Sequence, residues 1–158
     1  MEKEFKEIIE DSKRSLKKIE HQIEERSEDF TDEVKEFWDD LKKSLSNVEE
    51  KLDDAYDEFE DNIKLKGHLG MMEAREQIEQ LEDVTFEFTS KIASDAQEEL
   101  DIVKLRAHLL KMESDDLMEE KQKELSAVYE RSKEEAEEMS IKAAKEFNQI
   151  VLKLTEIV

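Results

Sequence analysis

The sequence predicts an all-α fold in which long antiparallel helices form a three- or four-helix bundle or a coiled coil. Residues that favour turns are scarce, since the 158 residues include no Pro and only two Gly. Glu, Lys, Leu, Asp and Ala dominate the composition, as they do in long helices. Apolar residues also recur every three or four positions, which is the spacing of one helix face. These observations favour a few long helices joined by short turns.

Each predicted helix carries a stripe of apolar side chains and is charged on its other faces. The stripes run from Phe5 to Ile23, from Phe30 to Ile63, from Met71 to Leu110 and from Leu125 to Ile157. Trp38 lies where the second stripe broadens, and we interpret it as core packing because a single Trp in a bundle is usually half-buried. If it were exposed beside Phe30, it would instead mark a docking patch for a partner. The whole chain, residues 1–158, is expected to form a single helical domain.

The turns have to be predicted from charge and capping signals, because the apolar periodicity hardly stops. A helix end favours basic side chains, and the next helix start favours Ser, Thr or Asp followed by acids. These signals coincide near residues 27–31, 68–72 and 112–115. They predict one short and three long helices, each long helix having about 40 residues and a length of about 60 Å.

Three further places match a capping box, in which a Ser begins a helix and an acid or amide follows three residues later. They begin at Ser46, Ser94 and Ser132. Such matches arise by chance in a sequence so rich in Ser and Glu. We therefore interpret all three as exposed faces of continuous helices.

An internal repeat links residues 64–74, K-L-K-G-H-L-G-M-M-E-A, with residues 104–114, K-L-R-A-H-L-L-K-M-E-S. The pattern suggests a helix end, a turn and a helix start that occur twice. Gly67 and Gly70 fit either a helix end or a close approach of two backbones, and we favour the helix end because Gly is enriched there.

The repeat also places apolar side chains on two faces of one helix. Leu105 and Leu109 share one face, and Val103 and Ala107 share another. A helix that is apolar on two sides is enclosed by neighbours, which favours self-association or binding of a protein partner. The candidate interface residues are Leu65, Leu69, Leu105 and Leu109.

Each copy of the repeat carries a His and a Met four residues apart, namely His68 with Met72 and His108 with Met112. This spacing places both side chains on one helix face, where they could bind copper or haem iron. The simpler interpretation is a His near a helix end beside a Met that fills the core. We favour that interpretation and assign no metal and no cofactor.

No motif for catalysis is present in the sequence. There is no Glu-x-x-His pair, no Gly-rich phosphate loop, no nucleophile elbow, and no zinc-ligand spacing. Pairs of carboxylates at helical spacing are expected by chance among 46 acidic residues. We therefore predict that the protein is not an enzyme and has no catalytic residue.

The composition also restricts the partners. A formal charge of −21 repels nucleic-acid phosphates and anionic lipids. No apolar run reaches 18 residues and the N-terminal segment has no apolar core, so we expect no stable membrane insertion and a cytoplasmic location. Reversible, apolipoprotein-like lipid binding stays an alternative, because the helices are long and amphipathic.

Two strings resemble stretches of small, Cys-free, bacterial coiled-coil proteins of a stress-response family. They are W-D-D-L-K-K-S-L at 38–45 and K-L-K-G-H-L-G-M-M-E-A at 64–74, and the resemblance covers about a fifth of the chain. It implies a soluble bacterial helical protein with a role in stress and without catalytic residues. The leading hypothesis is a non-enzymatic helical interaction or structural protein. The alternatives are metal or haem binding and lipid binding.

Overall fold

The computed structural model describes residues 2–61, 64–111 and 116–157, and these residues form an all-α bundle, as predicted. The elements are α1 (Glu2–Glu24), the 3-10 helix η1 (Ser27–Asp29), α2 (Asp32–Glu60), α3 (Lys64–Ala93), the 3-10 helix η2 (Gln97–Glu99), α4 (Ile102–Lys111), α5 (Asp116–Arg131) and α6 (Lys133–Ile157). The α-helices contain 10 to 30 residues, so the predicted length of about 40 residues is wrong.

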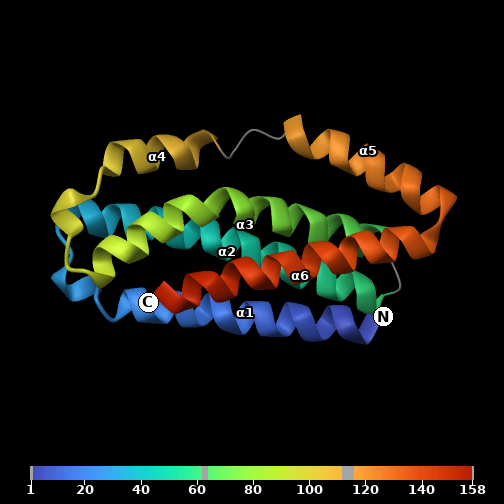
Figure 1. Cartoon of the computed structure of the whole chain (residues 1–158), viewed down its shortest axis with the longest axis horizontal. Coiled ribbons are helices and arrows are strands. Elements are labelled where there is room, and N and C mark those ends of the chain that lie inside the picture. The colour runs from blue at the N-terminus through green and yellow to red at the C-terminus, as the bar shows by residue number, and fades with distance from the viewer. Residues whose placement is uncertain (1, 62–63, 112–115, 158) are drawn as a thin grey trace.

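Helices α1, α2, α3 and α6 form the four sides of the bundle, as Figure 1 shows. The first three alternate in direction, as predicted, but α6 runs parallel to α1 and α3. Two contacts fix this direction, because Lys145 pairs with Glu4 near the start of α1 and Asn148 bonds Ser12 further along. Helices α4 and α5 return the chain to the end where α6 begins; α4 packs on α2 and α3, and α5 packs on α3 and α6.

Most residues of the predicted apolar stripes form the core, whereas Val103 and Ala107 of the third stripe are exposed. Fully buried side chains include Ile9, Leu16, Ile19, Phe37, Leu41, Leu45, Leu52, Ile78, Phe88, Phe147 and Val151. Trp38 is also buried, which confirms its predicted place in the core, and its indole N–H donates to a Glu24 carboxylate oxygen at 2.5 Å. The hydrogen bond satisfies the one polar group of a ring that is otherwise surrounded by apolar atoms.

The turn predicted at 27–31 is confirmed, but the turn predicted at 68–72 is wrong. Thr31 caps α2, because its side-chain oxygen accepts the Val34 N–H at 3.3 Å. Helix α3, in contrast, begins at Lys64 and continues through 68–72. The prediction for 112–115 lies outside the described residues.

Gly67 and Gly70 lie within α3, where their lack of a side chain allows α2 and α3 to approach closely. A Cβ at Gly67 would lie 2.6 Å from Cε1 of Phe59, and a Cβ at Gly70 would lie 3.2 Å from that of Ala55. The first distance is shorter than any normal contact. The glycines therefore make room for α2, which is the alternative that we did not favour.

Two of the three capping-box matches mark real breaks. Helix α3 ends at Ala93, where Asp95 adopts a left-handed conformation with φ of 57° and the Ala96 N–H bonds the Lys91 carbonyl at 2.8 Å. This geometry is typical of a Schellman helix end, which usually contains Gly in place of Asp95. Helix α6 starts after Ser132, whose hydroxyl accepts the Glu135 N–H at 3.3 Å.

The third match, at Ser46, lies within α2, as we interpreted it. The interpretation of the other two as continuous helix is wrong. The end of α3 has Asp95 in the left-handed position where Gly is usual, so the sequence lacks the common signal for a helix end. A Ser cap resembles any exposed Ser until its hydrogen bond is known.

A pair of carboxyl groups lies in the seam between α1 and α2. Burial, followed by the charge of Glu49, raises the pKa of Glu20 to about 7, and burial also raises the pKa of Glu49. Two carboxyl groups can share a hydrogen bond only when one of them keeps its proton. Lys42 and Lys17 oppose the shift at Glu20 but do not cancel it.

This pair predicts a gain in stability when Glu20 is replaced by Gln. A carboxyl whose pKa is raised in the folded state favours folding below about pH 4.5, and this contribution is lost as the pH rises to about 7. At about pH 8, Glu20→Gln should raise the free energy of unfolding by about 1–2 kcal/mol, because the seam is part-exposed and partly screened. Urea unfolding of wild type and of Glu20→Gln at about pH 4.5 and at about pH 8 measures the effect.

The matched control is Glu50→Gln, since Glu50 is an exposed neighbour on α2. This substitution should change the free energy of unfolding by less than about 0.5 kcal/mol at either pH. An equal gain from both substitutions would show that the general loss of negative charge, and not the pair, is responsible.

Candidate interaction surface

His68 lies inside the bundle, and its immediate neighbours come from four other helices. The imidazole is 1% exposed, and its Nδ1 lies 2.5 Å from the hydroxyl of Ser140 on α6. The rings of Phe5, Phe59 and Tyr129 surround it, with centroids 5.4 to 6.2 Å away. Burial, followed by the charge of Lys64, lowers the pKa of His68 to about 4. The ring is therefore neutral at physiological pH.

The second His of the repeat is in a different environment. His108 is exposed on α4. Figure 1 shows that α3 and α4 begin at opposite ends of the bundle, so the two copies do not face one another. The first copy lies at the start of α3 and continues as helix, which corrects the predicted pattern of a helix end followed by a turn. In the second copy α4 ends at Lys111, and the turn predicted after it lies outside the described residues.

Within the described ranges, the two copies do not assemble the set of His and Met ligands that the metal hypothesis requires. Met72 is half-buried, and Met112 lies outside these ranges. The described His, Cys, Asp and Glu side chains also form no group of three that could hold a metal ion.

The four candidate interface leucines are largely covered by the chain itself. Leu105 is 3% exposed in the core, and Leu109 packs part-buried against the same core. Leu65 and Leu69 are half-buried on α3. The face of α4 that we expected to bind a second copy therefore packs onto its own bundle. Val103, on the other apolar face of α4, is 77% exposed.

A groove between α3 and α6 carries apolar side chains that the chain leaves exposed. Phe86 on α3 is 53% exposed and Leu152 on α6 is 47% exposed. The groove consists of two shallow depressions with volumes of about 550 Å³ and 430 Å³. Both are lined by Glu82, Lys153 and Glu156, so the depressions are continuous.

Acidic side chains dominate the edges of this α3/α6 groove. Its acidic residues are Glu79, Glu82, Asp83, Glu146 and Glu156, and its basic residues are Arg75 and Lys153. The α3/α6 groove therefore joins an exposed apolar floor to a negative rim.

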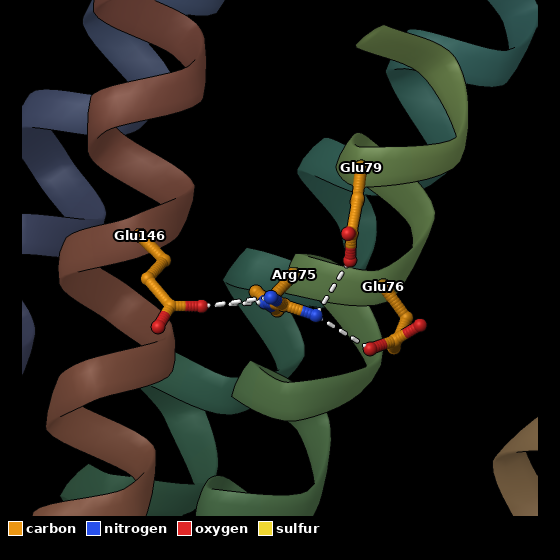
Figure 2. A network of polar contacts seen from close by, with 4 residues as sticks. All are labelled: Arg75, Glu76, Glu79 and Glu146. Carbon is orange, nitrogen blue, oxygen red and sulfur yellow. Dashed lines mark hydrogen bonds and ion pairs between the residues drawn. The ribbon is translucent and has the colours of Figure 1, made fainter.

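Arg75 is already neutralised by carboxylates, as Figure 2 shows. Its Nη1 lies 2.7 Å from Glu76 and 2.6 Å from Glu79 on its own helix. Its Nε and Nη2 reach Glu146 on α6 at 2.9 and 2.8 Å. The contact with Glu146 joins α3 to α6, and one guanidinium against three carboxylates leaves this end of the groove with a net negative charge.

The sequence contained a signal for the α3/α6 groove that we did not use. Phe86 lies between the stripe residues Thr85 and Phe88, and Leu152 lies between Ile150 and Leu154. A large apolar residue outside a stripe is a candidate for the surface, although Val84 and Val151, which also lie outside the stripes, are buried. Phe86 and Leu152 line the same groove only because α3 packs against α6.

Comparison of the chain with protein-family models, curated proteins and solved structures finds no match. No helix in the described ranges combines the length and the apolar character that crossing a membrane requires. The function is therefore inferred from the chain's own geometry.

Proposed function

We propose that the protein is a non-enzymatic helical-bundle interaction protein that binds a helix of a protein partner, or of a second copy, in the α3/α6 groove. The observation that supports this proposal most strongly is the exposure of Phe86 and Leu152 in adjoining depressions of one groove. They are about half exposed and lie on facing helices over one groove. Burying each of these half-exposed side chains against a partner would contribute about 1 kcal/mol to the free energy of binding.

The shape of the α3/α6 groove fits this function. Two adjacent helices leave a long shallow furrow between their side chains, and an amphipathic helix can place its apolar face there. Among the side chains that the structure describes, the further exposed large apolar residue is Val103, which stands on α4 and lines neither depression. It therefore offers a matched control for exposure without the groove.

The proposal predicts that a groove variant loses association and keeps its fold. The double substitution Phe86→Gln and Leu152→Gln replaces two surface side chains and no core side chain. The free energy of unfolding should therefore change by less than about 1 kcal/mol. Light scattering over a range of concentrations and affinity capture with the tagged full chain measure association. Val103→Gln serves as the control.

The expected result is one bound species, either a second copy or another protein, that wild type and Val103→Gln hold and the groove variant loses. Mass spectrometry of the captured material and the scattering mass identify which it is. If the groove variant keeps every association of the wild type, the proposed function is wrong.

A further inference from the structure

We infer that the α3/α6 groove binds a basic amphipathic helix of another protein and not a second copy of this chain. This inference rests on the proposed function and specifies its partner. The evidence is the charge around the groove, the position of its apolar residues and the charge of the whole molecule.

The rim charge favours a basic partner. Glu82 and Asp83 on α3 and Glu156 on α6 border the exposed Phe86 from both helices. At the other end of the groove, Glu76, Glu79 and Glu146 already pair with Arg75, which offsets part of their negative charge. The open part of the rim therefore lies around Phe86, where Lys153 is the one basic lining residue within the described part of the chain.

The charge of the whole molecule opposes a second copy. Each chain carries 46 acidic and 25 basic residues, for a formal charge of −21. Two such chains repel one another at long range, and a dimer through this groove would add rim acids to that repulsion. A helix with Lys and Arg on both sides of an apolar stripe would instead be attracted to the groove.

The dimensions of the groove specify the length of the partner helix. The lining residues on α3 extend from Arg75 to Phe86, which corresponds to about 16 Å of helix or about three turns. The partner would therefore present about three or four apolar side chains, spaced three and four residues apart, with basic residues on both flanks.

Three synthetic peptides with fluorescent labels test this inference on the full chain. The first has Leu at helical spacing and Lys elsewhere, the second has Glu in place of every Lys, and the third has the first composition with the Leu stripe scrambled. Fluorescence anisotropy measures binding to wild type, to the Phe86→Gln and Leu152→Gln groove variant, and to Val103→Gln.

We expect the Leu/Lys peptide to bind wild type and Val103→Gln with equal affinity, and the groove variant at least about tenfold more weakly. Its binding to wild type should weaken as salt is added, because the rim charges are exposed. The Leu/Glu and scrambled peptides should bind at least about tenfold more weakly than the Leu/Lys peptide.

Three outcomes would overturn the inference, and the first two of them leave the proposed function standing. The first is binding of the Leu/Glu peptide as tight as that of the Leu/Lys peptide and equally dependent on the groove. The second is a wild-type dimer that the groove variant loses, since the occupant would then be a second copy. Equal binding of the Leu/Lys peptide by wild type and groove variant would also overturn it, because attraction to the acidic surface in general would be the cause. Loss of the proposed function itself is measured separately, by the capture and scattering experiments on the same variant.

Discussion

Replacing Phe88 with Ala should lower the free energy of unfolding by about 3–5 kcal/mol. The ring is fully buried, and it stacks on Trp38 at 5.9 Å between centroids, with Phe37 at 5.4 Å and Phe30 at 6.1 Å. Truncation would remove these contacts and leave a cavity that the three rigid aromatic side chains cannot easily fill. Urea unfolding followed by circular dichroism measures the loss.

Phe86→Ala is the matched control for this prediction, because Phe86 lies two residues earlier in the same helix and is 53% exposed. It should change the free energy of unfolding by less than about 0.5 kcal/mol. The two substitutions alter the same side chain in the same way, so their difference isolates burial. Similar losses for the two variants would contradict the assignment of Phe88 to the core and Phe86 to the surface.

Protonation of His68 should destabilise the bundle by about 2–3 kcal/mol as the pH falls from about 6.5 to about 4. A His whose pKa is lowered in the folded state contributes stability above its ordinary pKa of 6.5 and loses it as the pH falls through that interval. The groups that face the ring are the hydroxyl of Ser140 and three aromatic rings, with Lys64 on its own helix. None of these groups carries the negative charge that would compensate a buried imidazolium in full.

The measurement is the free energy of unfolding at several pH values for wild type and for His68→Phe. Phe cannot be protonated, and Ser140 keeps the backbone carbonyls of Ala136 and Glu137 as acceptors at 3.1 Å. The difference between the two proteins should shrink or reverse as the pH falls. Glu20 changes stability in the opposite direction over part of this range, but it contributes equally to both proteins and cancels in the difference.

His108→Phe is the control, because His108 occupies the same place in the repeat but is exposed. It should leave the pH dependence of wild type unchanged. If His68→Phe also follows the wild-type curve, His68 does not account for the acid sensitivity. This pair of variants shows how a repeat in sequence can place equivalent residues in unlike surroundings.

Helix content and most of the core could be predicted from the sequence, because both depend on a local pattern. Side chains three and four residues apart lie on one helix face, so the stripe residues Phe37, Leu41 and Leu45 could be assigned to the interior before the fold was known. The start of α2 was also predictable, since Thr31 and the acids after it are a local capping signal.

The other boundaries depended on neighbours distant in sequence or on backbone conformation. In the sequence, Gly67 is consistent with a helix end, and only the packing of Phe59 of α2 against it shows its actual purpose. Asp95 ends α3 in a conformation that residues other than Gly rarely adopt, and the sequence shows no Gly there. Predictions of helix boundaries fail in such cases because Gly can mark either a helix end or a close helix contact, and because a residue other than Gly can end a helix.

The candidate site shows the same division more clearly. By itself the sequence determined an acidic, all-α chain with amphipathic helices and a stripe of core residues along each one. Only the tertiary structure decided that α6 runs parallel to α3, that Phe86 and Leu152 line adjoining depressions of one acidic groove, and that His68 is buried whereas His108 is exposed. The physical reason is that periodicity fixes which side of a helix is buried, whereas the identity of the helix that covers it depends on contacts between segments far apart in the chain.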